Sequence, residues 1–283
     1  MINLRLANFF HYAKQLGKDY FNAIVVDMPY GLFGNGTTLD DLKWDTRPDL
    51  DQLSKILNAL LINNGVLIVF ADFELVCELM SRWNDLFQLR EHFIWEKPGA
   101  YPSHKSRALR VHEFVLIFMK KDAKISSGTW NPKVLQGEPY TKRNKKASKS
   151  MRRQKKSAVN ENLSGLRHIR TVLQAPHKPT MYHWERKGIS HLTIKPVKLI
   201  ETLLKTYTNV GDNILEPFGG SASAALASYL INRNCISFEY DSTSFMEAVQ
   251  RFQRVKSMLD GKIINGYTRE PISSNFLNGE TCL

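Results

Sequence analysis

The chain has 283 residues, 43% of them hydrophobic and 23% charged, which is enough apolar sequence to bury a large core. Its longest apolar run is far below the ~18 residues of a membrane span, and its first residues lack the pattern of a signal peptide. Three cysteines without CxxC spacing argue against a zinc site or a disulfide framework. We therefore predict a soluble, cytoplasmic protein with no metal and no membrane contact.

The net charge of +12 is concentrated in one segment. Residues 142–156 (KRNKKASKSMRRQKK) carry nine Lys or Arg and no acidic residue, which leaves +3 for the rest of the chain. A local basic run indicates contact with a polyanion such as a nucleic acid, and a solvated loop is the alternative interpretation.

Strand-like and helix-like patterns alternate over the first 120 residues. Short apolar runs at 22–27 and 66–70 predict buried strands, and the periodicity of 53–61 predicts a helix between them. The next helix is predicted to bury Phe73, Val76, Cys77 and Met80. Segments 92–95 and 114–119 predict two further strands, paired as a hairpin with a long connection.

From about 122 to 190 the periodicity fails, which predicts an irregular insertion. Regular patterns then return with a helix that begins at Pro196 and a strand at 213–216. A helix at 221–230, a strand at 235–239 and a last helix follow. Strands that alternate with helices predict an α/β fold, with a mostly parallel sheet covered on both faces.

The strand at 213–216 runs into a turn of small residues, Pro217 to Ala222, and then into a helix. Small residues let a ligand approach the backbone N–H groups at a helix start. Glu239, about 20 positions later at the end of the next strand, is placed to bind ribose hydroxyls. This pattern indicates a nucleoside-cofactor site, and the alternative is a tight turn beside an ordinary acid.

A second constellation, Asp27-Met28-Pro29-Tyr30-Gly31, directly follows the first buried strand. A carboxylate can accept hydrogen bonds from an exocyclic amino group, a proline fixes the backbone, and an aromatic ring can stack on an extruded base. A turn capped by Asp27 is the alternative interpretation.

In this order, the two constellations resemble the amino-group DNA methyltransferases in their permuted, beta-class arrangement, including phage members. The resemblance covers nearly the whole chain. Seven segments resemble family motifs: 27–31 (DMPYG), 43–45 (KWD), 94–98 (IWEKP), 112–119 (HEFVLIFM), 130–140 (WNPKVLQGEPY), 191–197 (HLTIKPV) and 216–223 (EPFGGSAS).

The sequence departs from the family pattern at a few motif positions. Met28 and Glu216 replace Pro and Asp, and Leu192 and Ile194 replace Pro and Gln. Ala222 replaces a glycine, so its methyl group is expected to crowd the cofactor or to demand a negative φ.

The resemblance implies a Rossmann-like, seven-stranded, mostly parallel sheet with one antiparallel strand and an inserted, irregular target-recognition region. It divides the chain into a catalytic half (1–121), the target-recognition insertion (122–190), a cofactor-binding half (191–262) and a C-terminal tail (263–283).

The resemblance also implies roles for individual residues. Asp27, Met28, Pro29 and Tyr30 would hold the target amine. S-adenosylmethionine would be bound by Asp27, His191, Thr193, Lys195, Glu216, Pro217, Phe218, Gly219, Gly220, Ser221, Ala222 and Glu239. DNA would be contacted by Lys105, Arg107, Arg110, Lys142, Arg143, Lys145, Lys146, Lys149, Arg152, Arg153, Lys155 and Lys156.

The implied activity is site-specific methyl transfer to N6 of adenine in double-stranded DNA, by base flipping and direct in-line transfer. No Pro-Cys pair is present for a covalent intermediate. Asp27 favours adenine, because the cytosine enzymes more often carry Ser there. N4-cytosine transfer is the first alternative, a DNA-binding protein on a decayed methyltransferase scaffold is the second, and an RNA substrate is a weaker third. The resemblance also suggests restriction-modification, with a cognate restriction nuclease as a partner and a monomeric or homodimeric enzyme.

Overall fold

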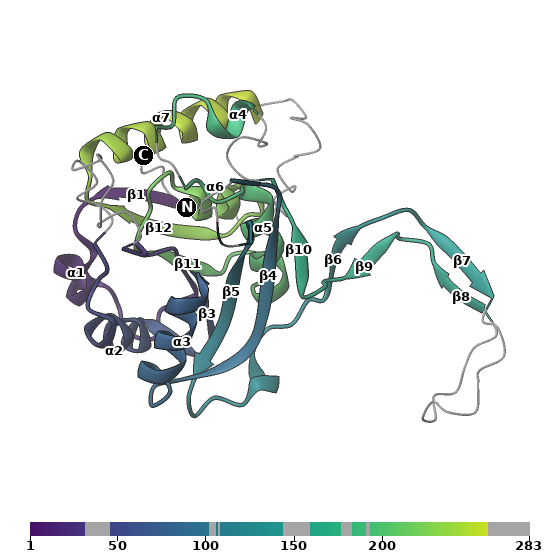
Figure 1. Ribbon diagram of the computed structural model, residues 1–283, viewed down its shortest axis with the longest axis horizontal. Coiled ribbons are helices and arrows are strands. Elements are labelled where there is room, and N and C mark those ends of the chain that lie inside the picture. The colour runs from purple at the N-terminus through teal and green to yellow at the C-terminus, as the bar shows by residue number, and fades with distance from the viewer. Residues whose placement is uncertain are drawn as a thin grey trace.

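An eight-stranded sheet with the order β1-β12-β11-β2-β3-β5-β4-β10 forms the centre of the protein (Figure 1). The computed structural model describes residues 1–31, 46–101, 106, 108–143, 159–176, 183–190 and 193–259. The strands of the sheet are β1 (Ile2–Leu6), β2 (Phe21–Val26), β3 (Leu61–Ala71), β4 (Phe87–Tyr101), β5 (Arg110–Lys120), β10 (Val172–Gln174), β11 (Asn213–Glu216) and β12 (Asn234–Glu239).

The directions of the strands confirm the predicted fold class. β5 runs antiparallel to both of its neighbours, β3 and β4, and every other neighbouring pair is parallel. The predicted hairpin is the β4–β5 pair. The predicted count of seven strands is wrong by one, because β10 adds to the edge of the sheet through Val172–Gln174. Three residues, with only Leu173 buried, are too short to give a periodic signal.

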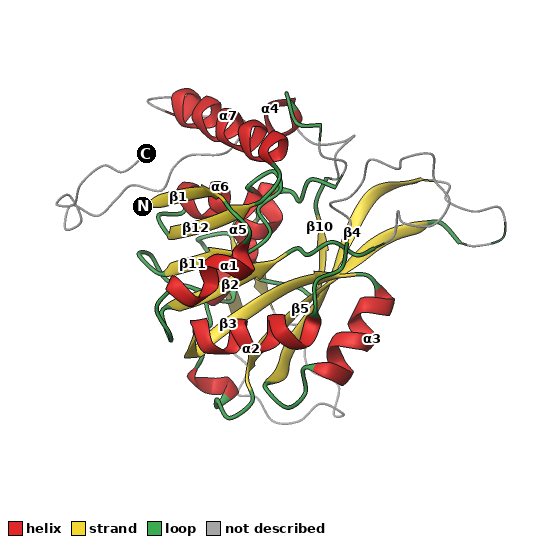
Figure 2. Cartoon of the chain, turned by 90° about the vertical axis from the view of Figure 1, so that its left-hand side faces the viewer, coloured by secondary structure: helices red, strands yellow, loops and turns green. Residues whose placement is uncertain are grey.

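Helices cover both faces of the sheet. They are α1 (Phe9–Tyr12), α2 (Leu50–Leu60), α3 (Phe73–Arg82), α4 (His183–Arg186), α5 (Val197–Tyr207), α6 (Ser223–Leu230) and α7 (Ser242–Leu259), with 3₁₀ turns at Ala13–Gln15 and Ile125–Ser127. One core cluster joins the sheet to α5, α6 and α7, and a second joins it to α1, α2 and α3. In Figure 2, α1 and α2 lie in front of the strands. None of the helices in the described part of the chain is long and apolar enough to cross a membrane.

The segment from 122 to 190 is more regular than predicted. β6 (Lys133–Gln136) pairs with β9 (Leu166–His168), and β7 (Tyr140–Arg143) pairs with β8 (Val159–Asn162), both antiparallel. We call these two pairs the arm. The arm extends outward from the β10 edge of the sheet (Figure 1). Short, mostly exposed strands of this kind bury too little apolar surface to show an alternating pattern in the sequence.

The predicted buried face of α3 is wrong for Phe73, Cys77 and Met80, whereas Val76 is partly buried against the core. Phe73 and Met80 are 66% and 41% exposed, whereas Leu75 and Leu79 are fully buried. Leu75, Leu79 and Trp83 follow one another at four-residue intervals, and the Trp83 indole N–H donates to the Leu50 carbonyl at 3.0 Å. Two apolar stripes run along this helix, and the tertiary contact with α2 decides which of them is buried.

This difference can be tested with two truncations. We expect Leu79→Ala to lower the free energy of unfolding by about 2–5 kcal/mol, because it opens a cavity in the core. Phe73→Ala, the matched change on the face predicted from sequence, should lower it by less than about 1 kcal/mol. Urea unfolding of both variants measures the two values, and a larger loss for Phe73→Ala would contradict the structure.

Candidate active site

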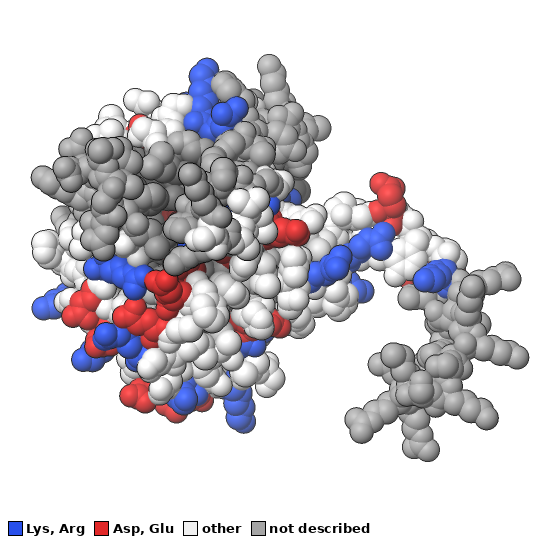
Figure 3. All heavy atoms as spheres, in the orientation of Figure 1, with Lys and Arg blue, Asp and Glu red and all other residues white. Residues whose placement is uncertain are grey.

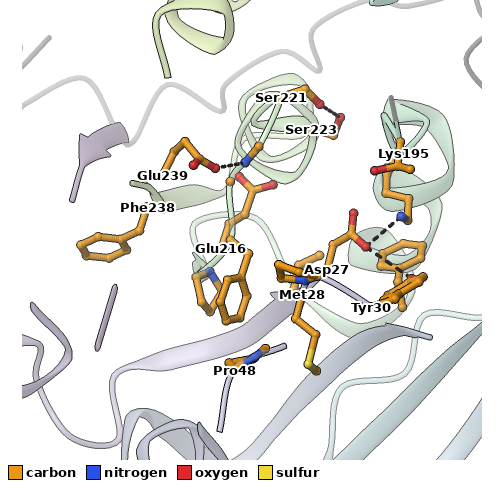
Figure 4. A pocket seen from close by; sticks show the side chains of 18 of the residues that line it. Asp27, Met28, Tyr30, Pro48, Lys195, Glu216, Ser221, Ser223, Phe238 and Glu239 are labelled. Carbon is orange, nitrogen blue, oxygen red and sulfur yellow. Dashed lines mark hydrogen bonds and ion pairs between the residues drawn. The ribbon is translucent and has the colours of Figure 1, made fainter. Parts of the chain in front are cut away.

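Two segments far apart in the sequence meet at one edge of the sheet. β2 and β11 are parallel neighbours, with Ala23 opposite Ile214 and Ile24 opposite Leu215. The carboxyl ends of both strands therefore lie together, and they carry Asp27 and Glu216. A cavity of about 650 Å³ lies at this edge and is lined by both residues and by the turn that follows Glu216 (Figure 4).

Asp27 is the centre of a partly buried polar cluster, and its side chain is 26% exposed. Its Oδ1 lies 2.8 Å from Lys195 Nζ and accepts a longer hydrogen bond, 3.5 Å, from the Tyr30 hydroxyl. The Tyr30 hydroxyl also lies 3.4 Å from Oε2 of Glu113, on β5. Lys195, which precedes α5, and Tyr30, which follows β2, thus come from different elements to the same carboxylate.

Glu113 and Lys97 belong to this cluster, although the motif analysis assigned them no role. Glu113 Oε2 lies 3.5 Å from Lys195 Nζ, and its Oε1 lies 2.5 Å from Lys97 Nζ. Glu113 faces Trp95 across the β4–β5 pair, and Lys97 lies two residues further along β4. The sequence carried two signals: both residues lie in segments that resemble family motifs (94–98 and 112–119), and Glu113 directly precedes an apolar run (FVLIFM).

Burial and neighbouring opposite charges shift the pKa values of this cluster in opposite directions. Burial raises the pKa of the Asp27 carboxyl, and the nearby Lys195 only partly offsets that effect. For Glu113, burial acts the same way, but Lys195 and Lys97 together outweigh it, so its pKa lies below the ordinary value. Burial would lower the pKa of Lys195, but Asp27 and Glu113 raise it instead. The cluster is therefore a set of mutually compensating charges.

The backbone of Tyr30 is held by Arg47, which also lines the cavity. Arg47 Nε donates to the Tyr30 carbonyl at 2.5 Å, and Arg47 Nη1 pairs with Glu78 of α3 at 2.9 Å. Met28 is 2% exposed and packs in the core, and Figure 4 shows its side chain pointing away from Asp27. A methionine is therefore accommodated where the family has proline.

The turn after β11 lies close against β12. Gly219 N donates to the Phe238 carbonyl at 2.6 Å, and a Cβ on Gly219 would lie 2.7 Å from Ser237 Oγ and 3.0 Å from that carbonyl oxygen. Gly220 N donates to Glu239 Oε2 at 2.6 Å. The turn thus depends on glycine at 219 for its distance from β12, and one Glu239 oxygen already contacts its backbone.

Ala222 corrects one expectation about this turn. Its φ is +54°, so the predicted negative φ is wrong. The left-handed conformation costs an alanine about 1–2 kcal/mol relative to a residue in the right-handed region. Its methyl group is buried in the core beside α6 and is not among the groups that line the cavity.

Glu216 is used by the fold as well as by the cavity wall. Its two carboxylate oxygens accept from Ala224 N at 2.9 Å and from Ala225 N at 3.2 Å, in the first turn of α6. Burial raises its pKa to about 7, against the opposing effect of these hydrogen bonds and of one with Ser237. Glu216 therefore fixes the end of β11 to the start of α6.

Most of the predicted amine and cofactor residues line this one cavity. They are Asp27, Met28, Pro29, Tyr30, Thr193, Lys195, Glu216, Pro217, Phe218, Gly219, Gly220, Ser221 and Glu239. Ala222 lies behind the wall, and His191 lies outside the described residues.

The predicted DNA contacts are less completely described. Arg110 lines the cavity, and Lys142 is exposed on β7 of the arm, on which Figure 3 shows Lys and Arg side chains. The backbone of Arg143 ends β7, but its side chain is not described. Outside the described residues lie Lys105, Arg107, Lys145, Lys146, Lys149, Arg152, Arg153, Lys155 and Lys156, together with the KWD segment at 43–45.

The raised pKa of Glu216 predicts a pH dependence of stability. Protonation of Glu216 favours the folded state. This contribution to stability is complete below the pKa of Glu216 in the unfolded chain, near 4.5, and is lost as the pH rises through about 7. Between pH 5 and pH 8 the wild type should lose about 2 kcal/mol more unfolding free energy than Glu216→Gln. Urea unfolding at both pH values measures this difference. The exposed Glu74→Gln should keep the wild-type dependence, and equal slopes for wild type and Glu216→Gln would contradict the prediction.

The chain also matches known proteins in sequence. The N6/N4 DNA methylase family model matches residues 21–250. The type II methyltransferase M.XycI of Xanthomonas campestris pv. cyanopsidis is 27% identical over 171 residues, which is 60% of this chain and 46% of that protein. M2.MboI of Moraxella bovis is 30% identical over 81 residues, 29% of this chain and 30% of that protein. The chain thus spans less than half the length of these relatives.

Solved structures share the fold. The M1.HpyAVI–SAM complex aligns with a TM-score of 0.55 at 21% identity, over 89% of this chain and 100% of that one. The PvuII DNA methyltransferase, named cytosine-N4-specific, aligns with a TM-score of 0.61 at 16% identity, over 91% of this chain and 90% of that one. Because the family match extends from β2 into α7 and includes both halves of the cavity, the chain belongs to the N6/N4 DNA methylase family.

Proposed function

We propose that this protein is an S-adenosylmethionine-dependent DNA methyltransferase that methylates N6 of adenine in duplex DNA. The observation that carries the proposal is the single cavity between the Asp27 turn and the glycine turn at the carboxyl ends of β2 and β11. A methyl transfer needs a donor site and an acceptor site that open onto each other. Two neighbouring parallel strands provide that arrangement.

One end of the cavity fits the adenosine part of the cofactor. Phe218 packs 6.4 Å from the rings of Phe9 and Phe10, and Phe9 packs 5.7 Å from Phe238, all of them cavity-lining side chains. Such an aromatic end suits a purine ring. Glu239, beside it, supplies a carboxylate for ribose hydroxyls, and Gly219 lets the turn pack closely on β12.

The other end fits the acceptor. When bound, S-adenosylmethionine supplies a methyl group on a positively charged sulfur. Asp27 accepts a hydrogen bond from the extruded base's amino group, which fixes the orientation of the nitrogen, and the Tyr30 ring stacks on the base. The methyl group passes directly to the nitrogen, so no covalent intermediate with the protein is required.

The choice of adenine rests on Asp27 at the first motif position. N4 of cytosine is the alternative, since it presents the same kind of amine and a protein of similar fold is named cytosine-N4-specific. The test is to methylate duplex DNA with a labelled methyl donor, digest it to nucleosides and identify the product by mass spectrometry. We expect N6-methyldeoxyadenosine. N4-methyldeoxycytidine would overturn the assignment of adenine as the target base. The absence of any labelled nucleoside would favour a DNA-binding protein on a decayed methyltransferase scaffold.

We further propose that residues 122–190 form the target-recognition region, with the flanking segments as catalytic and cofactor-binding halves. The arm supports this, because it extends from the sheet and its strand β7 carries Lys142, the first residue of the basic run at 142–156. Phosphate contacts would make binding depend on salt concentration. A partner nuclease fits relatives named type II methyltransferases.

Substitution of Asp27 tests the acceptor. Asp27→Asn keeps the shape of the side chain but removes its charge and one acceptor oxygen. We expect kcat to fall by about 10²-fold or more while DNA affinity stays near the wild-type value. Steady-state methylation and DNA binding by fluorescence anisotropy measure both. Asp85→Asn, an exposed control, should leave kcat unchanged, and full turnover by Asp27→Asn would refute the role of Asp27.

Substitution of Gly219 tests the donor site. Gly219→Ala places a methyl group against Ser237 Oγ and the Phe238 backbone, so the turn must move away from β12. We expect the Kd for S-adenosylmethionine, measured by calorimetry, to rise at least about tenfold, which corresponds to a loss of about 1.4 kcal/mol of binding free energy. Gly17→Ala, whose new Cβ would meet only Tyr20 at 3.7 Å, should bind as the wild type does. Equal affinities for the two variants would place the cofactor elsewhere.

A further inference from the structure

The side chain of Lys195 lies against carboxylates rather than along the turn that the family resemblance links to the cofactor. Its Nζ is 2.8 Å from Asp27 Oδ1 and 3.5 Å from Glu113 Oε2, and the side chain is 6% exposed. The ring centroids of Tyr30 and Phe70 each lie 5.5 Å from the same nitrogen. Figure 4 shows the lysine pointing at Asp27. The ammonium group is enclosed by two acids and two aromatic faces.

We propose that Lys195 is a positioning residue for Asp27, which it holds as a charged, fixed acceptor for the target amine, and that it does not bind the methyl donor. That Asp27 accepts a hydrogen bond from the target amine rests on the proposed function. That Lys195 keeps the Asp27 carboxyl ionised does not.

Asp27 needs such a partner because of its surroundings. Only an ionised carboxylate offers both oxygens as acceptors, since a protonated one becomes a donor. Burial disfavours the charged form, and Glu113 adds a like charge. Glu216, on the neighbouring strand β11, is coupled to Asp27 electrostatically, and Tyr30 donates to it. Among the groups described around Asp27, Lys195 supplies the direct cationic contact, and Lys97 acts from behind Glu113.

The charges also explain why this lysine can lie beside a site for a sulfonium ion. An unpaired ammonium group would repel a positively charged sulfur at short range. Lys195 and Lys97 together with Asp27 and Glu113 sum to zero. Pairing within the cluster therefore removes the repulsion while the carboxylate of Asp27 stays charged.

The first test measures Asp27 itself. In protein labelled with ¹³C at aspartate carboxyl carbons, the Asp27 signal is assigned by its loss in Asp27→Asn and followed through a pH titration. We expect Lys195→Met to move its titration to higher pH and Lys195→Arg, which keeps the charge, to leave it near the wild-type position. An unmoved titration in Lys195→Met would overturn the proposal. This readout does not depend on whether the protein methylates DNA.

The second test separates the two roles by kinetics. A positioning role predicts that in Lys195→Met the ratio of kcat at pH 9 to kcat at pH 6 rises about tenfold over wild type, because Asp27 must ionise without help. The Kd for S-adenosylmethionine should change less than about threefold. A tenfold loss of cofactor affinity with an unmoved pH profile would assign Lys195 to the cofactor instead. A merely structural role would lower kcat equally at both pH values.

Lys195→Met leaves two buried acids without their shared cation, so its folding must be checked by circular dichroism. If it fails to fold, Lys195→Met combined with Glu113→Gln removes one acid together with the cation. Lys195 affects Asp27 more strongly than Glu113 does, so this double variant should still titrate Asp27 above the wild-type position. A titration at or below the wild-type position would count against the proposal.

Discussion

The parallel pairing of β11 with β2 is the constraint on which the site depends. These strands are about 190 residues apart in the chain, and each alone ends in an unremarkable turn. Their register brings Asp27 and Glu216 to one edge of the sheet, so Asp27 and the turn after Glu216 line the same cavity. The fold therefore holds the two segments close together before any ligand binds.

Removing the charged cluster at this edge from water costs free energy, and the pairing of its opposite charges offsets that cost. Two carboxylates and two ammonium groups form a chain of ion pairs: Lys195 contacts Asp27 and Glu113, and Lys97 contacts Glu113. A buried pair contributes little net stability, but removal of one member leaves an uncompensated charge. The cluster therefore adds little to stability, which fits the proposal that it orients the Asp27 carboxylate.

Local patterns predicted the parts of the structure that depend on local physics. The strand at 213–216 and the helix after Pro196 are present as expected, because buried strands and amphipathic helices leave clear periodic signals. The family resemblance, rather than periodicity, linked Asp27 with the glycine turn, and both line one cavity. The roles of the residues in the cavity remain predictions.

The misses have a common cause in contacts between distant segments. The eighth strand, β10, and the pairing within the arm depend on register rather than on periodicity. The same holds for the buried stripe of α3, which α2 selects, and for Glu113, which reaches Lys195 only once β5 lies beside β3 and β4. The positive φ of Ala222 could not be predicted either, because alanine itself disfavours it.

One strand connects the arm with the chemistry. β4 pairs with β10 through Ile94, Trp95 and Glu96, and its Trp95 indole N–H donates to the Ala175 carbonyl at 2.9 Å, just beyond β10. Lys97, the next residue along β4, carries the ammonium group that neutralises Glu113. The base of the arm is thus held by Glu96, which is bonded directly to Lys97. A force that displaces the arm would therefore act on the same strand that places Lys97 beside Glu113.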